Sequence, residues 1–165
     1  MIELKINDEA LRYSWAKARD LGKLKNSITA GEGNAAGFIG EYLVSEYLQG
    51  VLTNTYDHDI LVPEGSIDLK TKRVTSAPFP HYECSVADFN TKQACDFYAF
   101  ARVECLNTKY TRAWFLGIIR KEEYFNKARK LIKGTKDGSN GFIVRADCYN
   151  LRIDQLYLTV EDALK

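Results

Sequence analysis

The alternation of apolar and charged residues in segment 66–72 (Ser-Ile-Asp-Leu-Lys-Thr-Lys) limits what this chain can fold into more than any other feature. In an extended strand, side chains at every second position share one face. One face therefore carries the apolar side chains of Ile67 and Leu69. The opposite face carries the charged side chains of Asp68 and Lys70. This pattern predicts a β-strand with one face against a core and one charged face.

The residues before this segment predict its partner strand. Residues 59–62 (Asp-Ile-Leu-Val) favour a strand, and the following Pro-Glu-Gly is turn material, so the two segments predict a β-hairpin. Pairing Ile60 with Ile67 keeps the apolar face intact, whereas a slip of one residue would mix the two faces. The register that preserves the core also places Asp59 opposite Asp68, and Asp57 opposite Lys70.

Two facing aspartates point to a bound cation, because like charges directly opposite one another destabilise a hairpin. Mg²⁺ prefers oxygen ligands and is usually held by one or two carboxylates, several waters and substrate phosphate. Lys70 would then stabilise negative charge on a scissile phosphate, or orient and deprotonate the attacking water. Both roles stay open. Two carboxylates and an amine together predict cleavage of a phosphodiester assisted by Mg²⁺ or Mn²⁺.

A simpler interpretation is that Asp68 and Lys70 form the solvated face of an edge strand, with Lys72 and Arg73 only keeping that edge soluble. The Asp-Leu-Lys triplet is weak by itself, because Glu-Leu-Lys at 3–5 repeats the pattern without an acidic residue upstream. The hairpin and its second aspartate distinguish the later triplet. We therefore favour the functional interpretation.

A helix is predicted from Ala35 to Leu48, with Asn34 as its N-cap. Apolar residues recur in it at helical spacing, namely Phe38, Ile39, Tyr42, Leu43 and Tyr47. Glu41 lies beside this stripe, near Gly37 and Gly40. Glycine inside a helix costs about 1 kcal/mol relative to alanine, so the two glycines indicate close approach of another backbone or of a metal site. The alternative is a glutamate that reaches solvent from the helix flank.

In this order and spacing, the helix with Gly-Phe-Ile-Gly-Glu, the isolated aspartate and the Asp-Leu-Lys strand resemble the PD-(D/E)xK nuclease superfamily. The resemblance covers Ala35 to about Val103 and implies the restriction-endonuclease-like fold. The site residues that it implies are the metal ligands Asp59, Asp68 and the carbonyl of Leu69, the catalytic lysine Lys70, and the accessory acidic residue Glu41. The chain departs from the family pattern at His58, where many members have proline, so Asp57 competes for the first aspartate position.

Length and composition predict a single α/β domain over residues 1–165, with a mixed β-sheet flanked by helices. The chain is 45% hydrophobic, enough for one sizeable core, and contains no linker or repeat. We expect an N-terminal helix and loop in 1–34, a motif-bearing core in 35–103, and sheet completion, a basic helix and a tail in 104–165. The further predicted elements are a helix at 8–24 with Leu11, Trp15, Ala18 and Leu21 inward, a connecting loop at 27–34, a short helix at 86–92, strands at 95–103 and 113–119, a basic helix at 124–133 and apolar residues at 142–144.

Basic side chains cluster although the net charge is only +1, with 23 Lys plus Arg against 22 Asp plus Glu. The clusters lie in 17–25, 70–73 and 120–136, a distribution that suits a polyanion. The alternative for the helix at 124–133 is an ordinary solvated face. The residues expected to contact nucleic acid are Lys72, Arg73, Lys127 and Lys130.

The sequence therefore predicts a divalent-metal-dependent DNA nuclease, with an endonuclease as the preferred interpretation. A non-catalytic nucleic-acid-binding module or an interaction subunit on the same fold is the alternative, and RNA stays open as a substrate. The N-terminus is mixed and charged and no run of 18 apolar residues occurs, so we expect an intracellular, cytoplasmic protein without a membrane partner. Cutting both strands of a duplex would favour a symmetric homodimer.

Overall fold

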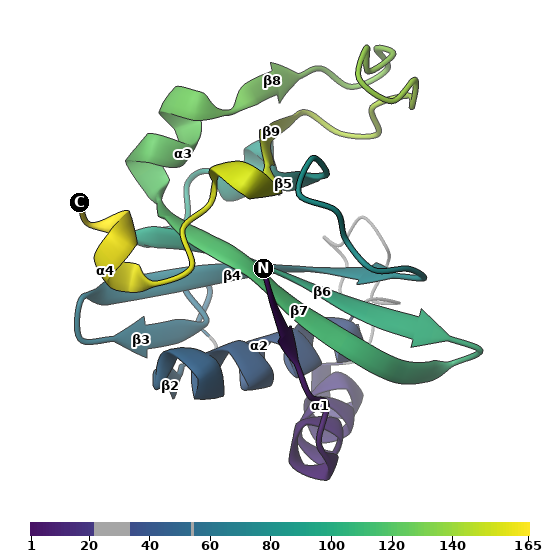
Figure 1. Cartoon of the computed structure of the whole chain (residues 1–165), viewed down its shortest axis with the longest axis vertical. Helices are drawn as coiled ribbons and strands as arrows, with labels where there is room; N and C mark the ends of the chain where they lie inside the picture. The colour runs from purple at the N-terminus through teal and green to yellow at the C-terminus, as the bar shows by residue number, and fades with distance from the viewer. Residues whose placement is uncertain (22–33, 54) are drawn as a thin grey trace.

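The structure is a computed structural model that describes residues 1–21, 34–53 and 55–165 (Figure 1). It is a mixed α/β structure with two β-sheets. In spatial order, the strands of the six-stranded sheet are β1 (Ile2–Leu4), β7 (Lys109–Arg120), β6 (Phe97–Leu106), β4 (Gly65–Val74), β3 (Ile60–Val62) and β2 (Val51–Leu52). The strands of the three-stranded sheet are β5 (Glu83–Ala87), β9 (Cys148–Arg152) and β8 (Arg129–Leu131). The helices are α1 (Asp8–Leu21), α2 (Asn34–Leu48), α3 (Lys121–Lys127) and α4 (Val160–Ala163), with 3₁₀ turns at Asp88–Asn90 and Ile153–Gln155.

The predicted hairpin is confirmed as β3 and β4. The strands are antiparallel, and Ile60 pairs with Ile67 as the apolar pattern required. Both side chains are fully buried. On its other side β4 runs parallel to β6, while the remaining neighbours in the six-stranded sheet are antiparallel. The sheet is therefore mixed, as expected.

Helices and the second sheet cover opposite faces of the six-stranded sheet. Helices α1 and α2 lie on one face, and α3 with the three-stranded sheet lies on the other (Figure 1). Val44 of α2 packs with Ile67 and Leu69 in one core cluster. Tyr98 of β6 packs with Tyr124 of α3 in another cluster, beneath the second sheet. The charged face of β4 thus points toward the second-sheet side.

Helix α2 packs closely on β4 at Gly40. A Cβ atom at this position would lie 2.3 Å from Oγ1 of Thr71, so only glycine permits the observed separation. The predicted close approach is confirmed here. Gly37 differs, because a Cβ atom there would have no neighbour within 4 Å among the described residues. Open space therefore lies one turn before Glu41.

Three predicted elements near the C-terminal half were wrong. The basic helix expected at 124–133 ends at Lys127, and residues 129–131 instead form β8, which pairs with β9. Residues 86 and 87 complete β5, and only a 3₁₀ turn follows them. The apolar residues 142–144 make one isolated bridge, between Ile143 and Lys136. A second sheet, which the sequence did not predict, takes up residues 86–87 and 129–131.

Helix α1 is confirmed, but its inward face was assigned incorrectly at one position. Trp15 was expected inside and is 56% exposed, whereas Ala10 and Ser14 are fully buried. Residues 22–24 of the predicted helix and 27–33 of the predicted loop lie outside the described residues. None of the described helices is long and apolar enough to cross a bilayer.

Candidate active site

Asp59 ends the pairing between β3 and β4. Its backbone N–H donates to the carbonyl of Ile67 at 2.9 Å, although the register partner of Ile67 is Ile60, so the regular ladder ends here. At the next step, the backbone N–H of Leu69 donates to Oδ2 of Asp59 at 2.8 Å. A side chain thus replaces the partner strand. Beyond this point, β4 has no paired strand on its β3 side within the described residues.

The carbonyl of Leu69 faces the same edge as Asp59. In a strand, the N–H and C=O groups of one residue point the same way, because a hydrogen-bonded antiparallel pair exchanges both bonds. The N–H of Leu69 points at Asp59, so its carbonyl oxygen also points toward this open edge. The predicted backbone ligand therefore lies on the side where Asp59 lies.

Asp68 and Lys70 lie together on the opposite face of β4 from Leu69. Asp68 is only 2% exposed. The Lys70 ammonium donates to Oδ1 of Asp68 at 2.9 Å and lies 2.6 Å from Oδ2. Oδ2 accepts no well-oriented hydrogen bond from the described residues, so charge attraction alone holds it. The period of two predicted this shared face.

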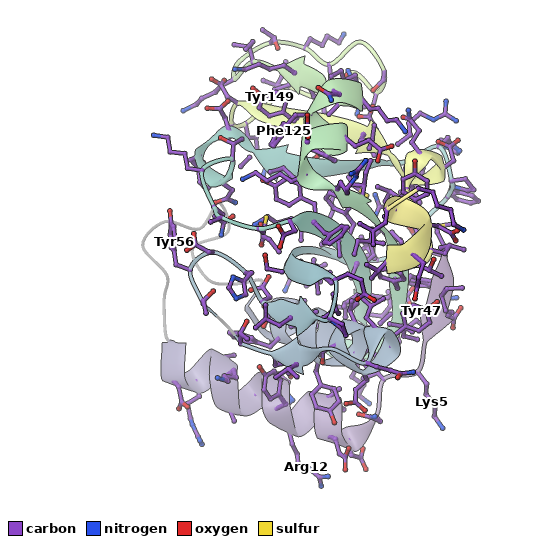
Figure 2. All side chains as sticks on the ribbon, turned by 90° about the vertical axis from the view of Figure 1, so that its left-hand side faces the viewer. Lys5, Arg12, Tyr47, Tyr56, Phe125 and Tyr149 are labelled. Atoms are coloured by element: carbon purple, nitrogen blue, oxygen red, sulfur yellow. The ribbon has the colours of Figure 1, made fainter. Side chains whose placement is uncertain are left out.

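Gln93 provides a second acceptor for the Lys70 ammonium. No sequence pattern predicted a role for Gln93. Its Oε1 accepts from Nζ of Lys70 at 3.1 Å, and its Nε2 donates to the carbonyl of Tyr56 at 2.7 Å. Lys121 in turn donates to the backbone carbonyl of Gln93. Tyr56 projects from the surface (Figure 2). Gln93 therefore connects Lys70 to two loops that are distant in the sequence.

Glu41 of α2 faces this group of carboxylates. Its Oε2 is buried and has no hydrogen-bond partner among the described residues. Burial, and then the charge of Asp59, raise the pKa of Glu41 to about 8, although Lys17 and Lys70 act in the opposite direction. Lys17 comes from α1 and belongs to the basic cluster predicted at 17–25. Glu41 is thus part of the site and does not point into solvent.

Asp59 is also held in an environment that disfavours its negative charge. Burial, and then the charge of Asp68, raise the pKa of Asp59 to about 7, against the hydrogen bond from Leu69. Neighbouring carboxylates with raised pKa values need protons or a cation to coexist.

The donor set suits Mg²⁺ or Mn²⁺, since it consists of carboxylate and carbonyl oxygens. Two of these oxygens, Oε2 of Glu41 and Oδ2 of Asp68, are buried and accept no hydrogen bond from the described residues. Among the described residues, however, no three His, Cys, Asp or Glu side chains are gathered closely enough to hold a metal together. A metal at this position would therefore rest on one or two carboxylates, as is usual for Mg²⁺, with water in the other positions.

Asp57, the competitor for the first aspartate position, directs its carboxylate to the backbone after Gln93. Its Oδ1 accepts a hydrogen bond from the backbone N–H of Ala94 at 3.0 Å. The sequence also predicted Asp57 opposite Lys70, and this was wrong because the chain turns between Thr55 and His58, whose backbones are hydrogen-bonded. The geometry therefore favours Asp59 over Asp57.

The four basic residues predicted to contact nucleic acid fall into two groups. Lys72 and Arg73 follow Lys70 along β4. Lys127 is paired with Glu123 at 2.6 Å. Lys130 is paired with Asp88 at 3.3 Å and lies over the ring of Tyr149. Tyr149 lies at the end of the molecule opposite α1 (Figure 2). The structure does not bring this second group to the carboxylates.

Neither a protein-family model nor a curated protein sequence matches this chain.

Proposed function

We propose that the protein is a divalent-metal-dependent DNA nuclease with the restriction-endonuclease-like arrangement of the PD-(D/E)xK superfamily. One observation carries the proposal: burial and neighbouring carboxylates raise the pKa values of Glu41 and Asp59, close to the ion pair between Asp68 and Lys70. These residues come from a helix, a strand entry and a strand centre. A solvated edge strand would not bury three carboxylates in one place.

The chemistry follows from where each group lies. Asp59 and Asp68, with the carbonyl of Leu69, would hold Mg²⁺ or Mn²⁺, which when bound supplies Lewis-acid activation of water and of the phosphate. Lys70 would move from Asp68 to the phosphate, or would orient the attacking water. Gln93 keeps the Lys70 ammonium on the phosphate side in either case. Glu41 would accept a hydrogen bond or a proton from bound water through its unpartnered oxygen.

Cleavage of labelled linear, nicked, branched and supercoiled DNAs with Mg²⁺ or Mn²⁺ tests this proposal. Lys70→Ala and Asp68→Asn should each reduce the rate by at least about 100-fold, in the range of a lost general acid–base or metal-ligand group. Lys5→Ala is the matched control, because Lys5 is the lysine of the other triplet and is exposed (Figure 2). Circular dichroism and urea unfolding would verify that each variant is folded. Cleavage that survives in both site variants would contradict the proposal.

One observation favours a non-catalytic nucleic-acid-binding module as the second candidate. Lys70 already neutralises Asp68, and no three acidic, histidine or cysteine side chains of the described residues converge on one point. In a binding module, DNA affinity would depend on salt, and no DNA would be cut with any metal. We include a homodimer in the nuclease proposal only if both strands of a duplex are cut. Sedimentation in the presence of DNA would measure the oligomeric state.

A further inference from the structure

A cleft of about 910 Å³ opens beside the far end of β4, starting two residues beyond Lys70. Its walls are Trp15 of α1, residues 72–76 of β4 and its exit, Tyr110 of the β6–β7 hairpin, and Phe142 of the loop between β8 and β9. Lys70 and Lys72 are two positions apart on one face of the strand, about 7 Å along it. The charged face of β4 therefore leads from the candidate active site into the cleft.

Two large aromatic side chains of the cleft are exposed to solvent. Trp15 is 56% exposed and Phe142 is 74% exposed. The ring of Trp15 lies 6.2 Å from that of Tyr110, tilted by 54°, so one of its faces stays accessible. Aromatic side chains that could bury large apolar areas are usually left exposed only where something covers them. Their position indicates a ligand with flat apolar surfaces.

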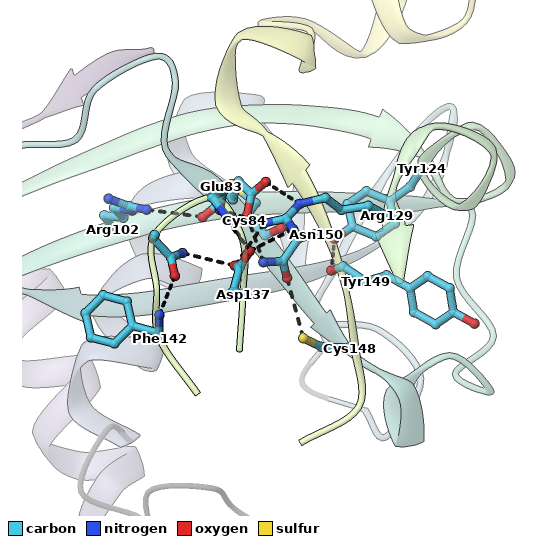
Figure 3. Close-up of polar contacts among 12 residues, drawn as sticks. Glu83, Cys84, Arg102, Tyr124, Arg129, Asp137, Phe142, Cys148, Tyr149 and Asn150 are labelled. Atoms are coloured by element: carbon cyan, nitrogen blue, oxygen red, sulfur yellow. Dashed lines mark hydrogen bonds and ion pairs between the residues drawn. The ribbon is translucent and has the colours of Figure 1, made fainter. Parts of the chain in front are cut away.

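A buried polar network holds Phe142 in this exposed position (Figure 3). Asp137 is buried and accepts hydrogen bonds from Arg129 at 2.8 and 2.9 Å and from Asn140 at 3.0 Å. Asn140 in turn accepts from the backbone N–H of Phe142 at 2.9 Å, and the Phe142 carbonyl accepts from the N–H of Asp137 at 2.8 Å. Arg129 also pairs with Glu83 of β5 at 2.6 Å. The loop is thus fixed to the second sheet with its phenylalanine outward.

Next to Lys72 of the cleft, the neighbouring strand carries a buried positive charge. Arg102 of β6 is the register partner of Lys72 and is only 6% exposed. Its guanidinium donates to the carbonyl of Glu83 at 3.2 Å and lies over the ring of Tyr82, and it forms no ion pair with an acidic side chain of the described residues. Buried charges are normally paired. Desolvation, and then the charge of Arg102, lower the pKa of Lys72. An anion beside Lys72 would favour the charged form of its ammonium and so oppose the lowering of its pKa.

The exposed aromatic side chains and the basic side chains that line this cleft together point to one chemical class of ligand. Bases of a single strand are free to stack on aromatic side chains while phosphates follow a basic groove, whereas bases in a duplex are already stacked. We propose that this cleft binds single-stranded nucleic acid, with bases on Trp15 and Phe142 and phosphates at Lys72 and Arg73. The strand then runs along β4 toward Lys70. The direction of the bound strand rests on the proposed function. The inference adds that the substrate of the proposed nuclease contains a single-stranded segment.

Binding can be measured without cleavage, in EDTA, with the full chain and a fluorescein-labelled oligothymidylate of about 10 nucleotides, within the site sizes of single-strand binders. Trp15→Ala and Phe142→Ala should each weaken binding by about 5- to 100-fold, the range for loss of one base–aromatic stack. Trp15→Phe should retain most of the affinity. Phe89→Ala is the matched control, because Phe89 is exposed on the 3₁₀ turn after β5 and does not line the cleft.

Salt dependence tests the basic side chains of the cleft separately. Lys72→Ala should lower the slope of log affinity against log salt by about 0.7, the value for one phosphate contact on a single strand, while Lys5→Ala should leave it unchanged. Affinities that do not change in both aromatic variants would overturn the proposal. It would also fail if a duplex of the same length bound as tightly as the single strand.

The two proposals fail in different ways. Single-strand binding that depends on Trp15 and Phe142, without cutting by any metal, would support the cleft and contradict the nuclease. Metal-dependent cutting that disappears in Lys70→Ala but is unchanged in both aromatic variants would support the nuclease and contradict the cleft. Specific binding of a peptide, with no oligonucleotide binding, would contradict the cleft as a nucleic-acid site.

Discussion

Replacing Glu41 with glutamine should change how the stability of this protein depends on pH. Glu41 brings a carboxylate oxygen without a described partner into a site that already holds Asp59 and Asp68. Glutamine has nearly the same shape and no charge. The substitution therefore removes the electrostatic cost of this position while it preserves the packing of α2.

The pKa of Glu41 gives the magnitude. It is raised from 4.5 to about 8, and one pKa unit corresponds to about 1.4 kcal/mol, so the ionised carboxylate destabilises the fold by at most about 5 kcal/mol. Part of this cost depends on Asp59, because its charge contributes to the raised pKa of Glu41. We therefore expect about 2–3 kcal/mol from Glu41→Gln at pH 8.5.

The sign follows from proton binding. Between about pH 4.5 and pH 8 the folded protein holds protons on Glu41 and Asp59 that the unfolded chain has released. The free energy of unfolding contributed by this site therefore falls as pH rises through that range. Below the unfolded pKa values both states are protonated and the contribution is constant. Glu41→Gln should flatten the slope and make the protein more stable at high pH.

Urea unfolding in EDTA at several pH values between 5 and 8.5 measures this effect. Glu46→Gln is the matched control, because Glu46 is exposed on the same helix. With Mg²⁺ added at pH 8.5, the wild type should gain stability and Glu41→Gln should gain less, since a bound ligand stabilises only the state that binds it. The reasoning would be refuted if Glu41→Gln were less stable than the wild type at pH 8.5 in EDTA.

Three further outcomes test other parts of the structure. Gln93→Ala removes the acceptor that orients Lys70, so the single-turnover cleavage rate should fall by about tenfold while Mg²⁺ affinity, measured by calorimetry, is retained. Gly40→Ala should destabilise the fold to urea by about 1–2 kcal/mol, because overpacking against Thr71 outweighs the gain in helix propensity, and Thr71→Ala should reduce this cost in a double-mutant cycle. Arg129→Ala should cost about 1.5–3 kcal/mol in urea unfolding, the range for hydrogen bonds to charged groups, because the buried carboxylate of Asp137 loses its cationic partner and keeps only the hydrogen bonds from Ser139 and Asn140.

The sequence allowed prediction of those parts of the candidate site that depend on the alternation of side chains along one strand or on close packing at one residue. The alternation in β4 gave the Ile60–Ile67 register and the face shared by Asp68 and Lys70, because a slip by one residue would have exposed the core. Gly40 signalled close packing because glycine is unfavourable in a helix without a reason.

The rest depended on contacts between distant segments. Residues 129–131 have a helical pattern, yet Arg129 is drawn to Glu83 and Asp137, and the segment pairs with β9. Gln93 has no sequence signature, since its role arises from the position of Lys70 on another strand. Trp15 was assigned to the core on hydrophobicity alone, although it lines the cleft. Tertiary contacts and function override local preference at such positions.

The hydrogen bond from Leu69 to Asp59 has a consequence for how this architecture can change by mutation. A β-sheet grows wherever a backbone edge is free, and here a carboxylate occupies the next pairing position and stops that growth. Substitution of Asp59 by an apolar residue would both remove a candidate ligand and leave an unguarded edge that invites strand addition and aggregation. Asparagine would retain an acceptor for Leu69 and lose only the charge. Loss of the proposed activity and loss of solubility are therefore separable at this residue, and a variant that loses only the candidate metal ligand is expected to carry asparagine.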